Sequence, residues 1–363
     1  MDRPSTTMVA RFEIAHGRFL DATGDVTRPL PGFAGEPGAL VALYRAMVLT
    51  RAFDAKAVAL QRTGRLGTFA SSLGQEAVGV GVASAMRAED VLVPGFRDQA
   101  AQLLRGVTPR ELLLYWGGDE RGSDFAGPRE DFPIAVPVAS QAPHAVGVAL
   151  ALKLRREARA VVSMVGDGAT SKGDFYEAIN AAGVWRLPLV VVISNNQWAI
   201  SHPRAAQSAA ETLAQKAIAA GILGEQVDGN DVIAVHDRVA QALQRARAGD
   251  GATLIEALTY RLGDHTTADD ARRYRDDAEV SARWHEEPIL RLRQHLVQRG
   301  AWSREDEEKN LTAAAAEMEQ AAEAYLATPP QPVTAMFDHL FATLPPSLAA
   351  QRAAALAEAA SHD

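Results

Sequence analysis

The sequence has 363 residues, 47% of them hydrophobic, which is ample for the core of one large α/β domain with an additional arm, or of two domains. Its net charge of −8 argues against a nucleic-acid partner, and its longest apolar runs are strand-sized, which argues against a membrane span. It has no cysteine, which excludes disulfides, thiolate metal sites and a cysteine nucleophile. Because the first residues also lack the apolar stretch of a secretory signal, we expect the cytoplasm as the location.

The first third of the chain predicts an arm followed by helices. Residues 1–35 combine two short strand-like runs, 11–14 and 18–20, with several prolines, so we expect an irregular arm that lies on another surface. Apolar residues at helical spacing predict the next helix at 38–61. The following elements are a glycine-containing buried helix at 75–86, a short strand before Pro94, a helix over 97–104, a Gly-, Asp- and Pro-rich loop at 117–133 and an alanine-rich helix at 140–155.

The middle of the chain carries the most informative pattern. An apolar run at 160–165 ends in Gly166-Asp167-Gly168, a helical segment follows, and a second apolar run at 189–193 ends in Asn195-Asn196. This order of strand, helix and strand indicates a parallel sheet, whose carboxyl ends are where ligands bind. An Asp, an Asn amide and a backbone carbonyl form half a coordination shell for Mg²⁺, which usually shares substrate phosphates. Glycines allow the backbone to approach such a diphosphate closely.

The remainder of the chain completes an α/β fold. We expect a doubly wound, mostly parallel sheet flanked by helices, with an N-terminal arm at 1–38, the α/β domain at 39–275 and a helical extension at 276–363. Asn230 or Asp231 is expected to cap the N-terminus of the helix at 232–248. The predicted elements are a helix at 209–220, a strand at 225–227, a helix at 232–248, a strand at 253–258, a mobile loop at 263–274, helices at 279–298 and 304–326, and a short helical tail.

The Gly-Asp-Gly and Asn-Asn pair, separated by 26 residues, resembles the thiamine diphosphate fingerprint. From about residue 40 to about residue 350 the chain resembles the alpha subunit of the first component of 2-oxo acid dehydrogenase complexes, of the pyruvate and branched-chain types. The segments that carry the resemblance are GRLGTFASSLGQEAVGVG (64–81), VLVPGFRDQ (91–99), GDGATSKGDFYEAIN (166–180), NNQWAIS (195–201), QVDGNDVIAV (226–235) and YRLGDHTTADDARRYR (260–275).

The resemblance implies a set of residues that hold the diphosphate end of the cofactor. Asp167, Asn196 and the main-chain carbonyl of Trp198 match the Mg²⁺ ligands. Gly168 and Ala169 then pass beside the diphosphate. Arg97 matches an arginine that binds the diphosphate, for which a forked guanidinium is suited.

The resemblance also implies residues around the reactive rings. Phe96 stands where a tyrosine is usual, and Ile200 is expected near the cofactor. Val136 and Val138 match the segment that touches the thiazolium and pyrimidine rings, where Val138 replaces a larger leucine that wedges the cofactor into a bent shape. His265 matches a catalytic histidine that faces the cofactor and helps in acyl transfer to lipoyl groups.

Three further residues or pairs have weaker matches. Ser140 and Gln141 match a monovalent-cation site of some relatives. Glu76 is the only internal candidate for the carboxylate that activates the pyrimidine, although its helical, glycine-flanked setting favours a packing role. His144, on the alanine-rich helix, is expected to be a packed or capping residue.

These matches favour an enzyme subunit that decarboxylates a 2-oxo acid and passes the acyl group to a lipoyl-bearing transacylase component. Pyruvate is the first choice of substrate, branched-chain 2-oxo acids are nearly as well matched, and acetoin is the third. Because the chain has only the diphosphate-binding half of such a site, we expect a beta subunit in a heterotetramer of two alpha and two beta chains. A magnesium-nucleotide protein is the alternative from another class, but no GxxxxGK[ST] loop is present. A catalytically silent paralogue would not retain Arg97, Asp167, Asn196 and His265 together.

Overall fold

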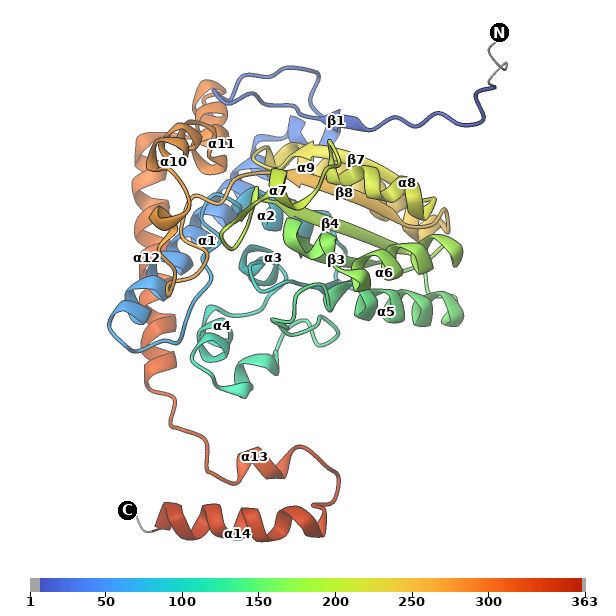
Figure 1. The fold of residues 1–363 in the computed structure, drawn as a ribbon. Helices are drawn as coiled ribbons and strands as arrows, with labels where there is room; N and C mark the ends of the chain where they lie inside the picture. Colours follow the sequence, from blue (N-terminus) through green and yellow to red (C-terminus); the bar gives the residue numbers. More distant parts are fainter. Residues whose placement is uncertain (1–6, 361–363) are drawn as a thin grey trace. The chain divides into compact units, whose positions relative to one another are not determined.

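The structure is a computed structural model that describes residues 7–360. Its centre is a six-stranded sheet in which every pairing is parallel, with the strand order β1-β7-β8-β4-β3-β2. Figure 1 shows the sheet between two layers of helices. This confirms the predicted α/β class. The strands are β1 (Ala15–Gly17), β2 (Val91–Val93), β3 (Val161–Gly166), β4 (Leu189–Asn195), β7 (Leu223–Asp228) and β8 (Thr253–Leu258).

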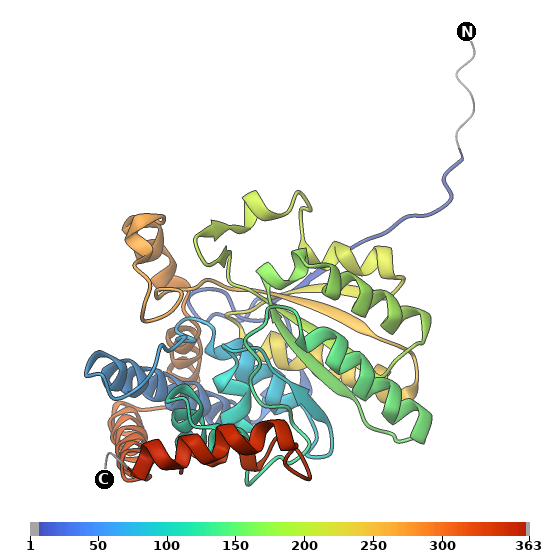
Figure 2. The same cartoon turned by 60° about the horizontal axis from the view of Figure 1, so that its bottom comes forward.

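The two faces of the sheet are buried by different helices, because strand side chains alternate between the faces. Val161 and Val165 of β3 pack into the core that contains α5 (Gln141–Arg155), α6 (Gly173–Val184) and α8 (Lys216–Ala220). Val162 and Met164 pack into the opposite core, with α1 (Pro37–Arg62), α2 (Glu76–Ala85) and α9 (Val232–Ala248). In Figure 2, α5 and α6 lie side by side on their face of the sheet. A parallel sheet that is covered by helices on both faces binds ligands at the carboxyl ends of its strands.

The register of the central strands determines where the Gly-Asp-Gly and Asn-Asn segments meet. Gly166 of β3 lies opposite Ser194 of β4, so both strands end at the same level. Asp167 begins a 3-10 turn (Asp167–Ser171), and after Asn196 the chain forms a small antiparallel hairpin of β5 (Trp198–Ala199) and β6 (His202–Pro203). The two motifs therefore lie at the carboxyl edge of the sheet, as predicted.

One helix near this edge was missed by the sequence interpretation. Besides the expected α3 (Gln99–Leu104), the chain forms α4 (Pro109–Trp116). Thr108 and Glu111 form a reciprocal capping box, and Pro109 occupies the first turn. Thr-Pro-X-Glu is a sequence signal for a helix start, so this helix was detectable. A 3-10 turn (Glu120–Ser123) lies within the otherwise irregular segment that follows.

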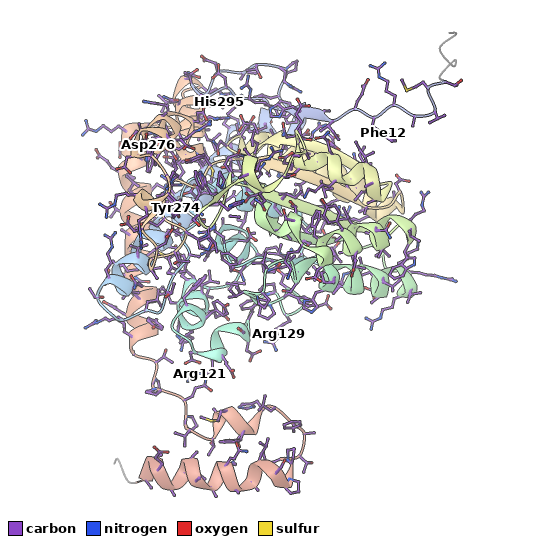
Figure 3. All side chains as sticks on the ribbon, in the orientation of Figure 1. Phe12, Arg121, Arg129, Tyr274, Asp276 and His295 are labelled. Carbon is purple, nitrogen blue, oxygen red and sulfur yellow. The ribbon has the colours of Figure 1, made fainter. Side chains whose placement is uncertain are left out.

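The predicted strands of the arm were wrong in position. Residues 11–14 are irregular, β1 lies between the two predicted runs, and Leu20 forms only an isolated bridge with Val26. β1 is held by backbone pairing to β7, and its side chains are largely exposed. The apolar residues used for the prediction therefore lie on either side of the strand and not within it. Farther out on the arm, Phe12 is exposed (Figure 3).

Two long predicted helices are also shorter in the structure. The predicted helix at 209–220 is reduced to a 3-10 turn (Leu213–Gln215) and α8, with α7 (Arg204–Gln207) before it. The predicted helix at 279–298 is divided into α10 (Asp277–Arg283), a 3-10 turn (Trp284–Glu286) and α11 (Pro288–Gln298). Pro288 lacks the N–H that would continue a helix, and Glu287 caps the new one by accepting from Ile289 N and Leu290 N.

The C-terminal part contains α12 (Arg304–Leu326), as predicted, followed by α13 (Ala335–Asp338) and α14 (Pro346–Ala360). The internal contacts divide the chain into a unit that ends at Ala322 and a unit that begins at Glu323. The domain boundaries at 38 and 275 stay predictions. Within residues 7–360, no helix combines the length and the apolar character that crossing a membrane requires.

Candidate functional site

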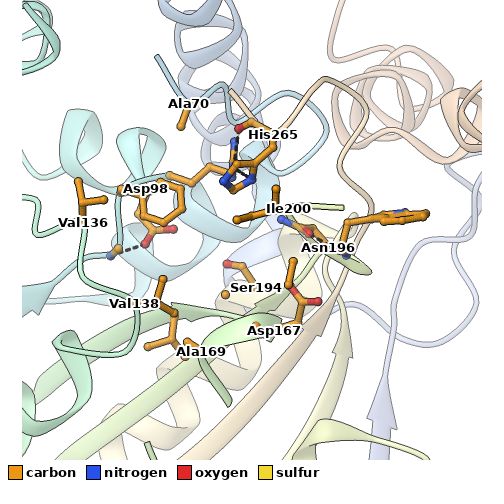
Figure 4. Close-up of a pocket in the computed structure, with 18 of the residues that line it drawn as sticks. Ala70, Asp98, Val136, Val138, Asp167, Ala169, Ser194, Asn196, Ile200 and His265 are labelled. Carbon is orange, nitrogen blue, oxygen red and sulfur yellow. Dashed lines mark hydrogen bonds between the residues drawn. The ribbon is translucent and has the colours of Figure 1, made fainter. Parts of the chain in front are cut away.

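A cavity of about 600 Å³ opens at the carboxyl edge of β3 and β4. Its wall contains all eleven residues that the sequence predicted for the cofactor site. These residues are Phe96, Arg97, Val136, Val138, Asp167, Gly168, Ala169, Asn196, Trp198, Ile200 and His265. In Figure 4, Asp167 and Asn196 lie on one side of the cavity and Val136 and Val138 on the other. The structure thus brings the predicted residues together, while their individual roles stay predictions.

The Asp167 carboxylate is one of two in the cavity wall, with that of Asp98. It is 2% exposed, and its one side-chain partner among the described residues is Gln207 Nε2, at 3.4 Å from Oδ2. Burial raises the pKa of Asp167 to about 6, against the opposing effect of backbone hydrogen bonds. The buried Asp167 carboxylate has no ion-pair partner in residues 7–360, so it is suited to binding a cation.

Asn196 presents its amide next to Asp167. The Asn196 Nδ2 group donates to Gln75 Oε1 at 2.9 Å, and Oδ1 accepts from the Trp198 amide at 3.2 Å. Asn195 has a different task, since its side chain bonds Glu256 at 2.6 Å and the Gln197 amide at 3.2 Å. This bracing supports Gln197, whose φ of 72° is left-handed. The chain can thereby turn back so that the Trp198 amide reaches the amide oxygen of Asn196.

Gly168 lies where the two motifs touch. A Cβ added to Gly168 would be 2.8 Å from Ala199 Cβ, so only glycine allows this approach. The close contact keeps the Gly-Asp-Gly turn against the hairpin that follows Asn196. A ligand beside Gly168 would therefore meet backbone rather than a side chain at that position.

Arg97 supplies the positive group of the wall. It donates to the Ser71 carbonyl at 2.5 Å and to the His265 carbonyl at 2.9 Å, and it has no ion pair with a carboxylate in the part of the chain that the structure describes. Burial and the nearby Arg261 guanidinium lower the pKa of Arg97 to about 10. A half-buried arginine without a carboxylate partner is suited to an anion such as a diphosphate.

His265 is neutral in this setting. Burial, then the positive charges of Arg97 and Arg261, lower its pKa to about 4. Its Nδ1 lies 3.2 Å from Arg97 Nη2 and 3.4 Å from Arg261 Nη1, and both of these groups are donors. Nδ1 therefore accepts, and the proton of the imidazole is on Nε2.

The segment 263–275, which was predicted as a loop, is irregular except for a 3-10 turn (Ala271–Arg273). Arg275 donates to the carbonyls of Arg261 and Gly263. Tyr274 accepts from Arg261 Nη2 at 2.8 Å and donates to Asp269. Tyr274 and Arg275 thus connect this segment to Arg261 and Asp269, while its mobility stays a prediction.

The remaining wall is apolar. Val136, Val138 and Ile200 are about half exposed, and Phe96 lies edge-on to His265 with ring centres 6.0 Å apart. Ile200 has a φ of 55°, so its backbone is in the left-handed region. Such strain in a β-branched residue needs support from its surroundings, here a hydrogen bond of 2.9 Å from Arg261 Nη2 to the Ile200 carbonyl.

Of the four residues with weaker matches, Gln141 lies in the wall of the cavity, whereas Glu76, Ser140 and His144 do not. Glu76 is fully buried, bonds Arg51 at 2.5 Å and is not part of the cavity wall, which agrees with a packing role. Ser140 Oγ donates to the Pro137 carbonyl at 2.8 Å, and Gln141 donates to the Ala135 carbonyl at 2.9 Å, so the monovalent-cation site stays a prediction. The His144 ring packs against Phe132 at 6.0 Å.

Sequence reasoning did not assign several polar residues of the wall, among them Gln75 and Asp98. Asp98 accepts from the Gly95 amide at 2.7 Å, and burial raises its pKa to about 6. Both residues lie in the quoted segments, next to Glu76 and Arg97. The contact of Gln75 with Asn196 joins residues 121 positions apart, and no local pattern indicates it.

The geometry defines a class of protein. It is a parallel α/β protein whose cavity lies at the carboxyl edge of the sheet and contains an oriented asparagine amide and a close-packed glycine turn. Within residues 7–360, its buried carboxylate Asp167 and its Arg97 have no ion-pair partner. This donor set fits a diphosphate together with a divalent cation.

The comparison with known proteins agrees with that class. The family model "Dehydrogenase E1 component" matches residues 44–333. The chain is 44% identical over 322 residues to the 3-methyl-2-oxobutanoate dehydrogenase subunit alpha of Mycobacterium tuberculosis (strain ATCC 25618 / H37Rv), which covers 88% of each chain. It is 39% identical over 346 residues to the pyruvate dehydrogenase E1 component subunit alpha of Staphylococcus aureus (strain N315), which covers 94% of this chain and 92% of that one.

The chain therefore belongs to the Dehydrogenase E1 component family. The predicted resemblance is confirmed, and so is the predicted function as an alpha-type subunit of a 2-oxo acid dehydrogenase. The use of thiamine diphosphate follows from the family.

Proposed function

We propose that this chain is the alpha subunit of an E1 component that decarboxylates a short 2-oxo acid and transfers the acyl group to a lipoyl group of a transacylase. The observation that carries the proposal is the placement of Asp167, Asn196 and Arg97 in one cavity at the carboxyl edge of the sheet. The unpaired negative and positive groups there are complementary to Mg²⁺ and to a diphosphate, respectively.

The chain's own residues would divide the work as follows. Asp167 and Asn196, with the carbonyl of Trp198, would hold Mg²⁺, while Arg97 and the Gly168–Ala169 backbone would hold the diphosphate. Thiamine diphosphate, when bound, supplies the electron sink for decarboxylation. Phe96, Val136, Val138 and Ile200 would exclude water from the reacting end. A possible monovalent cation at Ser140 and Gln141 is not needed for this assignment.

His265 would donate a hydrogen bond rather than bind a charge. Its imidazole is neutral and carries its proton on Nε2, with Nδ1 held by donors from two arginines. A neutral imidazole is suited to donating a hydrogen bond from Nε2 to a developing oxyanion or sulfur at the mouth of the cavity. We therefore assign His265 to the acyl transfer step.

A second chain would complete the site. The cavity wall contains two carboxylates, and neither is available to activate the pyrimidine. Asp98 accepts from the Gly95 amide, and Asp167 is assigned to the cation. Glu76 is sequestered by Arg51. The carboxylate that activates the pyrimidine would thus come from a beta subunit, in an assembly of two alpha and two beta chains. We propose the cytoplasm as its location, as predicted from the sequence.

For the acyl group we favour 3-methyl-2-oxobutanoate, whereas the sequence alone favoured pyruvate. The support is the higher identity to the branched-chain relative, 44% against 39%, and the small valine at position 138 on an apolar wall. Pyruvate is the second candidate and acetoin the third.

The test is calorimetry with thiamine diphosphate and Mg²⁺ on the chain produced with its beta partner. Asp167→Ala should abolish Mg²⁺-dependent binding without unfolding the chain, and Asp174→Ala, in an exposed ion pair with Lys172, is the control. Unchanged affinity in Asp167→Ala would refute the cofactor site. Initial rates with both 2-oxo acids then decide the substrate, and robust turnover by the alpha chain alone would refute the need for a partner.

A further inference from the structure

Gln75 is a buried wall residue with one end of its side chain bonded and the other end free. It is 5% exposed and lies immediately before α2. Its Oε1 accepts from Asn196 Nδ2 at 2.9 Å, across 121 residues of sequence. Its Nε2 is buried with no hydrogen-bond partner among the described residues. Buried donors in native proteins are normally satisfied, so a free donor in a cavity wall indicates that a bound ligand or water completes it.

The hydrogen bond matters because the two ends of the Asn196 amide differ. Only its oxygen can bind Mg²⁺, and an amide NH₂ in its place would repel the cation. Gln75 Oε1 can only accept, so it selects Nδ2 as its neighbour. The Trp198 amide, which can only donate, selects Oδ1 at 3.2 Å. Both contacts thus favour the same orientation of the Asn196 amide.

Gln75 is itself held in place by the residues on either side. Glu76 is bonded by Arg51 at 2.5 Å and accepts from the Gly74 amide at 3.0 Å, while the Gly74 carbonyl accepts from Thr259 at 2.9 Å. Gly74 has a φ of +87°, and a Cβ there would be 2.8 Å from the Tyr260 carbonyl. The buried ion pair of Glu76 therefore fixes the turn that carries Gln75.

We propose that Gln75 is a positioning residue for the cation, which holds the Asn196 amide with its oxygen toward Mg²⁺. The proposal rests on the proposed function, since it requires Asn196 to be a cation ligand. It also gives Glu76 a function, because the carboxylate stabilises the turn on which that orientation depends. A group behind a metal ligand typically changes metal affinity by roughly 10- to 100-fold when it is removed.

The test exploits the symmetry of a carboxylate. In Asn196→Asp both terminal atoms of the side chain are oxygens, so either orientation presents an oxygen to the cation. We expect Gln75→Met to weaken Mg²⁺ binding by roughly 10- to 100-fold in the presence of saturating thiamine diphosphate. In the Asn196→Asp background, the same substitution should cause no weakening that calorimetry can resolve. The non-additivity of this double-mutant cycle is the signature of orientation.

Two controls separate positioning from loss of structure. Gln99→Met removes a buried glutamine that bonds the Ala70 carbonyl and has no contact with Asn196; it should leave Mg²⁺ affinity unchanged. The melting temperature without Mg²⁺ should be similar for Gln75→Met and Gln99→Met. Equal weakening by Gln75→Met in both backgrounds, or no weakening in either, would overturn the proposal. A parent chain that binds thiamine diphosphate without any need for Mg²⁺ would instead overturn the proposed function on which it rests.

Discussion

Arg97 and His265 are 168 residues apart in sequence, yet the guanidinium of Arg97 contacts His265 at two points. Arg97 Nη2 donates to the His265 carbonyl at 2.9 Å and lies 3.2 Å from Nδ1 of the ring. Arg97 thereby anchors the backbone that carries the histidine and, together with Arg261, favours the tautomer with an acceptor Nδ1. The diphosphate-binding part of the proposed site and its histidine are thus coupled through one arginine.

This coupling predicts a change of the His265 pKa in Arg97→Met. Because a positive neighbour disfavours the imidazolium, its removal should raise the pKa from about 4 toward the ordinary value of 6.5. NMR titration of the ring should show the transition, and Arg129→Met, at an exposed arginine, should leave it unchanged (Figure 3). In the parent chain, a histidine with a lowered pKa makes stability rise with pH between about 4 and 6.5. An unshifted titration would show that Arg97 does not control His265.

Gly168→Ala should impair cofactor binding while the fold is retained. The added methyl group would meet Ala199 at 2.8 Å and separate the Asp167 turn from the Trp198 hairpin. Fluorescence titration with thiamine diphosphate and Mg²⁺ is the measurement. Gly173→Ala is the matched control, since nothing lies within 4 Å of a Cβ there. If both substitutions had the same small effect, the close approach at Gly168 would be irrelevant to the ligand.

Glu76→Ala should destabilise the chain strongly. The substitution leaves Arg51 half-buried with Glu287 as its remaining partner. Breaking a buried pair costs about 3–5 kcal/mol, and the lower end applies because Glu287 remains. Urea unfolding measures the loss. Glu319→Ala, in the more exposed pair with Lys56, should cost at most about 1 kcal/mol. Equal stability of the two variants would contradict the structural role of Glu76.

Asp231→Ala should release the N-terminal arm. Its carboxylate accepts from the amides of Phe19 and Leu20 at 2.7 and 2.8 Å and also caps α9. A lost N-cap costs about 1 kcal/mol, and each buried amide without an acceptor costs about 1–3 kcal/mol. Proteolysis near residue 20 should therefore become faster. Asp276→Ala removes an exposed cap of α10 and should leave this cleavage unchanged (Figure 3).

The parts of the fold that the sequence predicted are those with a local signal. Apolar runs identified β3, β4 and β8, and helical spacing identified α1, α9 and α12. The arm strand could not be found in this way, because β1 depends on backbone pairing with β7, more than 200 residues later. The break at Pro288 was detectable, because proline lacks the N–H that the interior of a helix requires.

The composition of the site was predictable and its internal contacts were not. Gly166-Asp167-Gly168 and Asn195-Asn196 share one βαβ unit, so topology alone brings them together. Arg97 with His265, and Gln75 with Asn196, join residues more than 100 positions apart. No periodicity in the sequence indicates such pairs, and the sequence interpretation accordingly did not identify Gln75.

The anchoring of the arm by Asp231 has a consequence for synthesis of the chain. Phe19 and Leu20 leave the ribosome early, but the carboxylate that receives their amides is made 212 and 211 residues later. At about 5–20 residues per second, the arm waits roughly 10–40 s before it can dock. During that interval two apolar side chains that end in the core are available to chaperones. The segment around Phe19 is thus translated more than 200 residues before it can acquire these native contacts.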